Sequence, residues 1–205
     1  SSETVSSDVS SSSGSADTAS AATAADTVNL AQGKGNDAFT LEMEGAGPDL
    51  DPATKDTTIR EKEESILNRL TDGYYGSGEI LDGNWNGSGM RSHYYEAYRQ
   101  IDRAITLDLG QLSHIESLSF HMQEGLGWGI SAPSMVTYFL SEDGVTFHRV
   151  GRVSRFDAVK DEDPDHYYSV VENGKEVNCQ SYYFTLDGLN YNARYVKVAF
   201  ELTGT

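Results

Sequence analysis

The chain has 205 residues, and 32 acidic against 15 basic residues give it a formal net charge of −17. This balance argues against a nucleic-acid partner, because phosphate binding needs clustered Lys and Arg, and it argues equally against an anionic membrane surface. The sequence has no apolar run near the ~18 residues needed to cross a bilayer, so we expect no direct membrane insertion and read the charge as solubility in an extracellular protein.

Residues 1–27 consist mainly of Ser, Ala, Thr and Asp, with no aromatic residue, Lys or Arg. Such a segment buries too little apolar surface to offset the entropy of ordering, so we expect a disordered linker. It is similar to the stalk that follows a bacterial signal or lipid anchor, and a plain interdomain linker fits the composition equally well. We expect one folded domain over 28–205.

The first elements of this domain carry modest signals. Phe39, Leu41 and Met43 alternate with other residues and predict a short strand. Apolar residues at roughly helical spacing within 56–70 predict a short surface helix that stops before Asp72.

The clearest strand signals lie within 104–144. Ile105, Leu107 and Leu109 alternate with Thr106 and Asp108, and we expect Gly110 to end that strand. The same alternation returns in two further runs, which are 118–122 and 136–140. Because each strand is followed by turn-forming residues, these runs predict an all-β, antiparallel β-sandwich rather than an α/β protein.

Three more strands are predicted at 147–153, 182–186 and 194–202. Between them, acidic residues cluster from Asp161 to Asp165, but without a fixed metal-ligand spacing, so we favour a solvated loop. Cys179 is the single cysteine, which excludes an intrachain disulfide, and we expect it to be a small buried hydrophobe rather than a nucleophile.

Six short motifs follow one another along the chain. They are Asn-Leu-Ala-x-Gly-Lys at 29–34, Leu-Thr-Asp-Gly at 70–73, Asp-Leu-Gly at 108–110, Gly-Ile-x-x-Pro at 129–133, Tyr-Phe-Leu-Ser-x-Asp-Gly-x-x-Phe at 138–147 and Ala-Arg-Tyr-Val-Lys-Val at 193–198. Together they resemble the galactose-binding-like, discoidin or coagulation-factor C-type fold, a group that includes family 32 carbohydrate-binding modules. The resemblance implies a jelly-roll sandwich whose opening strand covers 28–31.

Two Gly-rich segments contain the candidate ligand-binding residues. The candidates are Trp85, Arg91, His93, Tyr94, Tyr95, Gln123 and Trp128. Exposed aromatic rings can stack on the apolar faces of sugars, while Arg, His and Gln hydrogen-bond to hydroxyl groups, and Glu124 could do the same beside Gln123. The alternative is that Trp85 and Tyr94 cap the sandwich as a satellite hydrophobic cluster and that Trp128 is a lid over the core.

The resemblance also implies a structural calcium ion, with Asp72, Ser77 and Glu201 as its ligands. Flexible loops with hard oxygen donors suit calcium, so the chemistry is reasonable. The alternative is that Asp72 and Gly73 form only a turn.

The sequence contains no nucleophile elbow, zinc-binding His-Glu-x-x-His or phosphate loop, and nothing selects two of its many carboxylates as a glycosidase pair. We therefore expect a noncatalytic carbohydrate-binding module of a secreted or surface-anchored bacterial protein, with a glycan or polysaccharide as partner. The alternative is an adhesion or structural module that binds a protein or packs against a neighbouring domain. Exposed indoles in one concave site would favour the sugar, and a broad flat patch would favour a protein.

Overall fold

The computed structural model describes residues 27–45, 67–73, 101–124, 131–163, 169–172, 175–178 and 180–201. Its elements are η1 (Asn36–Ala38), β1 (Phe39–Gly45), η2 (Leu67–Leu70), β2 (Ile101–Ile115), β3 (Leu118–Glu124), β4 (Met135–Ser141), β5 (His148–Ser154), β6 (Val159–Lys160), β7 (Ser169–Glu172), β8 (Lys175–Asn178), β9 (Gln180–Leu186) and β10 (Tyr191–Glu201). The predicted linker at 1–27 lies outside these ranges except for Thr27, and it stays a prediction.

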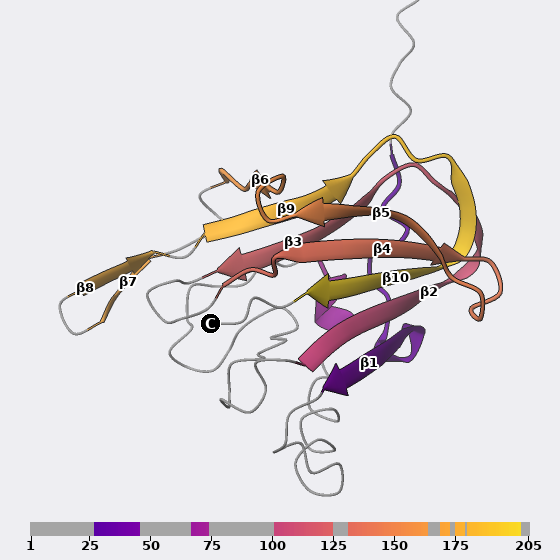
Figure 1. The fold of residues 1–205 in the computed structure, drawn as a ribbon, viewed down its shortest axis with the longest axis horizontal. Helices are drawn as coiled ribbons and strands as arrows, with labels where there is room; N and C mark the ends of the chain where they lie inside the picture. The colour runs from indigo at the N-terminus through magenta and orange to yellow at the C-terminus, as the bar shows by residue number, and fades with distance from the viewer. Residues whose placement is uncertain are drawn as a thin grey trace, which may run out of the picture.

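The strands build a two-layer sandwich (Figure 1). One sheet has five strands in the order β1-β2-β10-β4-β5, the other has three in the order β3-β9-β6, and β7 and β8 form a separate hairpin. Every strand pair is antiparallel, which confirms the predicted all-β fold class. No helix in the described part of the chain is long and apolar enough to span a membrane.

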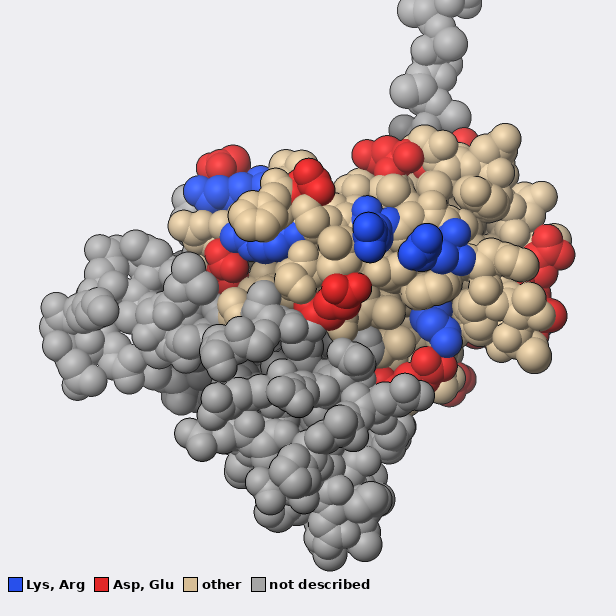
Figure 2. All heavy atoms as spheres, viewed as in Figure 1, with Lys and Arg blue, Asp and Glu red and all other residues tan. Residues whose placement is uncertain are grey.

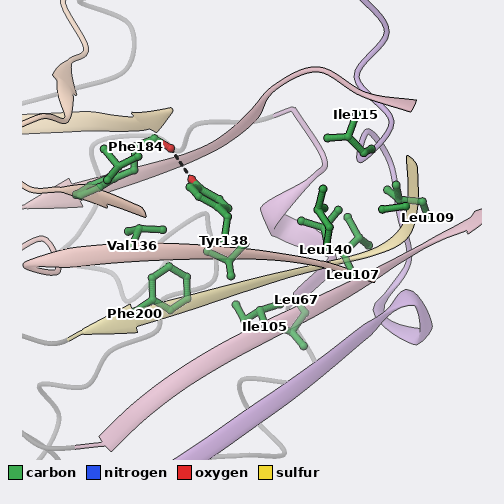
Figure 3. Packing of buried hydrophobic residues seen from close by; sticks show 14 of the residues in the cluster. Leu67, Ile105, Leu107, Leu109, Ile115, Val136, Tyr138, Leu140, Phe184 and Phe200 are labelled. Carbon is green, nitrogen blue, oxygen red and sulfur yellow. Dashed lines mark hydrogen bonds between the residues drawn. The ribbon is translucent and has the colours of Figure 1, made fainter. Parts of the chain in front are cut away.

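The core lies between the two sheets and follows the predicted alternation. Val136, Tyr138 and Leu140 of β4 are buried against Phe184 of β9 and Phe200 of β10 (Figure 3). The Tyr138 hydroxyl donates a hydrogen bond to the Phe184 carbonyl across the core. Burial raises the pKa of this hydroxyl, so it stays protonated and available as a donor. One polar bond therefore links the sheets at the centre of an otherwise apolar interface.

Gly110 does not end its strand as expected. β2 continues to Ile115, and Gly110 has a φ of 86° within it. The strand pairs Asp108 with Tyr195 and Ser113 with Ala193, so the register shifts at this point and the strand is bulged. A glycine adopts positive φ without steric cost, which lets β2 bend and resume pairing rather than stop.

A bidentate ion pair stabilises this bulge. Arg194 donates from Nε and Nη2 to the two carboxylate oxygens of Asp108, each at 2.8 Å, and Gly110 N donates to Asp108 Oδ1 at 2.7 Å. The hydrogen bond from Arg194 holds the pKa of Asp108 below its usual value. The Asp-Leu-Gly motif therefore has a structural role, which is to stabilise the bulge in β2.

The opening segment and η2 cover the part of the five-stranded sheet that the narrower sheet leaves open. Leu67 is 1% exposed and lies beside Ile105 (Figure 3), and Leu30 and Ala31 also pack against the core. One expectation is corrected here: residues 30–33 form a turn rather than an opening strand. The end of the predicted surface helix is confirmed, because Leu67–Leu70 form the 3-10 helix η2, which stops before Asp72 and buries Leu67 in the core. The rest of the predicted helix at 56–66 lies outside the described residues.

A second bulge changes the outer face of the five-stranded sheet. β4 pairs Thr137 with Arg152 and Phe139 with Arg149, with a register shift between Tyr138 and Phe139. Arg149 and Arg152 therefore share the outer face although they are three residues apart. Figure 2 shows Lys and Arg side chains over β4 and β5 on this face, with Asp and Glu between them and around them.

Candidate functional site

The topology brings Ile101, which follows one aromatic-rich segment, and both flanks of the other segment to one end of the sandwich. The segment 74–100 leads into Ile101 at the start of β2, and 125–130 connects Glu124 at the end of β3 to the stretch before Met135 of β4. β10 pairs with both β2 and β4, and its pairing places the beginnings of these two strands at the same end of the sheet. We call this the loop end (Figure 1).

The predicted ligand-binding residues fall mainly outside the described structure. Trp85, Arg91, His93, Tyr94, Tyr95 and Trp128 all belong to segments beyond the described ranges. Gln123 lies in β3 opposite Ser181, one residue before Glu124, and its side chain is also outside the description. Their contacts with a ligand remain predictions. The described residues of the loop end are those that lie at the base of the two segments.

Glu124, which the sequence predicts as a possible sugar ligand, forms an ion pair with Arg155 at the loop end. Arg155 Nη2 lies 2.7 Å from Glu124 Oε1, and its Nε lies 3.3 Å from Oε2. The backbone N–H of Ala132 also donates to Oε2, at 3.4 Å. Glu124 is 7% exposed. Because its two oxygens are already engaged, this carboxylate is a structural anchor and is not open to a sugar hydroxyl.

The guanidinium of Arg155 is held on a second side by an aromatic ring. Its Cζ lies 3.4 Å from the ring centroid of Tyr182, in a cation–π contact. The Tyr182 hydroxyl in turn donates to Gln180 Oε1 at 2.5 Å. Arg155 follows β5 of one sheet, whereas Tyr182 and Glu124 belong to the other. The cluster therefore ties the two sheets together at the loop end.

Arg155 also fixes both flanks of the segment that carries Trp128. Its side chain binds Glu124 on one flank, and its backbone N–H donates to the Ser134 carbonyl on the other, at 2.9 Å. Ser134 in turn donates from N and Oγ to the Glu201 carbonyl, at 2.9 and 3.1 Å. The base of the 125–130 segment is thus pinned to β3, β5 and β10. Glu124 and Arg155 are separated by 31 residues, and no local pattern in the sequence links them.

A second polar cluster lies on the outer face of the three-stranded sheet. His121 Nε2 and Asp161 Oδ2 are 2.9 Å apart, and the His121 ring lies 4.6 Å from that of Tyr183. Asp161 is only 5% exposed, and its N–H donates to the Ser181 carbonyl at 2.8 Å. This corrects the expectation of a solvated position for Asp161, whereas the neighbouring Glu162 and Asp163 are exposed as expected. Asp161 is buried because its side chain contacts His121 of β3 and its backbone bonds to Ser181 of β9.

The predicted calcium ligands lie in different settings. Asp72 is in the exposed turn after η2, where the neighbouring Thr71 carbonyl accepts a hydrogen bond from Gly33 N at 2.6 Å. Glu201 is the exposed last residue of β10, opposite Met135. Ser77 lies outside the described residues. Both carboxylates are hard oxygen donors of the kind calcium prefers. Within the described ranges, no group of three or more His, Cys, Asp or Glu residues could hold a metal ion, so the calcium site stays a prediction.

Comparisons with known proteins give only distant similarities. No protein-family model and no curated protein matches the chain. Similar solved structures include SpGH29, at 16% identity and a TM-score of 0.38, covering 87% of this chain but only 25% of that one. They also include CpGH89CBM32-5 from Clostridium perfringens in complex with GalNAc-β-1,3-galactose, at 14% identity, a TM-score of 0.37 and coverage of 83% and 88%. The C-terminal domain of a chitobiase from Bacteroides fragilis matches at 13% identity, a TM-score of 0.36 and coverage of 80% and 81%. Similarities this low assign neither a ligand nor an activity to this chain.

Proposed function

We propose that the chain is a noncatalytic carbohydrate-binding module of a secreted or surface-anchored bacterial protein. Its ligand would be a glycan or polysaccharide, bound at the loop end through the aromatic and polar side chains of 74–100 and 125–130. The observation that supports this most directly is the topology, which places Ile101 and both flanks of 125–130 at the same end of the sandwich. On this proposal, residues distant in sequence would contact one ligand.

The chemistry of these segments suits a sugar. Trp85, Trp128 and the neighbouring tyrosines offer flat apolar surfaces for pyranose rings, and Arg91, His93 and Gln123 offer hydrogen-bonding groups for hydroxyls. The Arg155 cluster supports this role because a fixed loop base lowers the entropy lost on binding. Affinity at a single site of this kind would be weak, and other modules of a larger parent protein would raise it through avidity.

Calcium is part of the proposal as a structural ion. Asp72, Ser77 and Glu201 would hold it through carboxylate and hydroxyl oxygens. When bound, the ion would brace loops and take no part in a reaction. Its presence would raise the thermal stability of the chain, since a ligand that binds only the folded state stabilises that state.

A glycan array probed with the full chain tests the proposal, run once with calcium and once with a chelator. We expect a reproducible sugar signal that is lost in Trp85→Ala or Trp128→Ala. Tyr191→Ala is the matched control, because Tyr191 is an exposed aromatic residue at the start of β10, the end of the sandwich opposite to the loop end. A drop in melting temperature with chelator would support calcium separately from the sugar.

A silent array with a folded protein would contradict the proposed function. The adhesion or domain-packing role would then be favoured, and the aromatic residues of 74–100 and 125–130 would be tested against protein partners instead.

A further inference from the structure

The region around β5 is basic in an otherwise acidic chain. Residues 148–160 contain four of the 15 Lys and Arg residues but only one of the 32 Asp and Glu residues. The four are Arg149, Arg152, Arg155 and Lys160, and β5 itself is an edge strand of the five-stranded sheet. This edge of the sheet is therefore positively charged although the net charge of the chain is −17.

The bulge in β5 brings two of these residues, Arg149 and Arg152, to the same face. In a regular strand, residues three positions apart point to opposite faces. Here Val150 packs against the core and Gly151 faces it, since a Cβ on Gly151 would lie 2.4 Å from Leu186 Cδ2. The extra inward-facing residue leaves both arginines on the outer face, where Figure 2 shows Lys and Arg side chains over β4 and β5.

Both arginine side chains are exposed, and within the described ranges neither has a hydrogen-bond or ion-pair partner. They lie opposite Phe139 and Thr137, which are two residues apart on β4, so they are about 7 Å apart along the strand. In contrast, Arg155, Lys160 and Lys197 each pair with a glutamate. An acid-rich chain thus leaves two neighbouring guanidinium groups available to an external anion.

We propose that Arg149 and Arg152 bind the carboxylate groups of an acidic polysaccharide, a polymer that contains uronic acids. Each guanidinium presents two parallel N–H groups that match a carboxylate, and the half-buried Phe139 beside Arg149 offers ring surface to the apolar face of a sugar. Exposed charges act over only about 8 Å at physiological salt, so at contact the two arginines have more effect than distant acidic residues.

The inference rests on the proposed carbohydrate-binding function and adds to it a ligand class and a second contact surface. β5 ends at Ser154, directly before Arg155 of the loop end. A polysaccharide that leaves the loop end along β5 therefore passes Arg152 and then Arg149. The arginines recognise its charge, whereas the loop end supplies contacts that a neutral sugar also makes.

Calorimetric titration of the full chain with an oligosaccharide of β-1,4-linked glucuronic acid tests this surface, and the methyl ester of the same oligosaccharide is the matched neutral ligand. We expect the acid to bind about tenfold more tightly than the ester, and this difference to shrink as salt is added. Arg149→Gln combined with Arg152→Gln should reduce the affinity for the acid to that for the ester. Arg149→Lys combined with Arg152→Lys should keep most of the difference, because the charges remain.

Arg69→Gln is the control for net charge, because η2 lies beside β2, away from the β5 edge, and it should leave the preference for the acid unchanged. The inference is wrong if acid and ester bind equally, or if the double Gln variant binds the acid as the natural chain does. It is also wrong if that variant keeps its affinity but self-associates in sedimentation, since the arginines would then protect the edge strand. In these cases the proposed function stands as long as the array signal depends on Trp128. If no glycan binds to the folded chain, both are overturned.

Discussion

Tyr138 shows how a single residue serves both the apolar core and the joining of the sheets. Its ring is 1% exposed among apolar neighbours, and its hydroxyl reaches the Phe184 carbonyl of the opposite sheet. A buried hydroxyl without a partner would be costly, so this bond makes tyrosine acceptable where the alternation pattern requires only an apolar side chain. It also restricts how the sheets slide over each other.

Replacing Tyr138 with Phe should lower the free energy of unfolding by about 1–2 kcal/mol, because the Phe184 carbonyl loses a buried partner while the packing volume changes little. Urea unfolding followed by circular dichroism measures this. Tyr191→Phe is the matched control, since Tyr191 is 48% exposed and its hydroxyl has water available. Equal denaturation midpoints for the two variants would show that the buried hydrogen bond adds nothing.

Asp143 provides the clearest pH dependence at the residue scale. It accepts hydrogen bonds from the N–H groups of Thr146 and Val145, each at 2.8 Å, and from Ser141 Oγ at 2.9 Å. These bonds favour the charged form and lower the pKa of Asp143 to about 2 from its ordinary 3.8. A carboxylate with a lowered folded-state pKa stabilises the fold above the ordinary pKa, and that stabilisation is lost as the pH falls toward 2.

Asp143→Asn should therefore lower the melting temperature at pH 7, while the gap to the natural chain should narrow steadily between pH 4 and pH 2. Asn keeps an acceptor oxygen for the turn but lacks the charge, which isolates the titration. Melting curves across this pH range provide the measurement. Glu142→Gln is the control, because Glu142 is an exposed neighbour that takes no part in these bonds. A gap that stays constant down to pH 2 would contradict the assignment.

At the scale of elements, the turn after β5 stabilises the loop end through the contacts of Arg155. Arg155→Ala should lower the free energy of unfolding by about 3 kcal/mol, because it leaves the Glu124 carboxylate largely buried and unpaired. Denaturant titration measures the loss. In contrast, Lys197→Ala should cost less than about 1 kcal/mol, since its partner Glu42 is half-exposed.

A double variant separates the ion pair from the packing of its two side chains. Glu124→Leu combined with Arg155→Met should be more stable than Arg155→Ala alone, because no buried charge is left without a partner. The opposite order would mean that the stacking of Arg155 on Tyr182, rather than the unpaired carboxylate, dominates the loss.

Strands with one buried face were predictable because their pattern is local. Val136, Tyr138 and Leu140 alternate in the sequence as they do in the core, and so do the apolar residues of β3 and β10. The prediction at Gly110 was wrong because a glycine after a strand suits both a stop and a bulge, and the choice depends on whether β2 resumes pairing with the distant strand β10. The β7–β8 hairpin was missed because its residues lie in a polar stretch without clear alternation.

The candidate site was predictable only in part, because local patterns can be recognised in a sequence and contacts between distant residues cannot. Gly-rich aromatic segments can be recognised from composition, and the topology places Ile101, which follows one of them, at the same end of the sandwich as both flanks of the other. The supporting residues could not be recognised, because Glu124 and Arg155 acquire their roles only from a contact across 31 residues. Asp161 likewise looked like one of several solvated acids until its pairing with His121 of β3 was visible.

At the scale of the whole molecule, two sheets of unequal width leave part of the core to be closed by non-strand segments. Leu30 and Ala31 pack against that part of the core, and Lys34 Nζ donates to the Leu109 carbonyl at 2.7 Å. In contrast, Thr27 and Val28 are exposed. The boundary of the folded unit should therefore lie between Val28 and Leu30, close to the predicted start of the domain.

Two truncations test this boundary. A chain of residues 28–205 should melt at the same temperature as the full chain, because the removed residues add no described core contact. A chain of residues 35–205 should lose roughly 2–4 kcal/mol, since it gives up the packing of Leu30 and Ala31 together with the Lys34 hydrogen bond. Calorimetric melting of the three chains distinguishes these cases. If the shorter truncation alone already lowers the melting temperature, the acidic tail belongs to the folded unit; if neither does, η2 closes this part of the core without help from the opening segment.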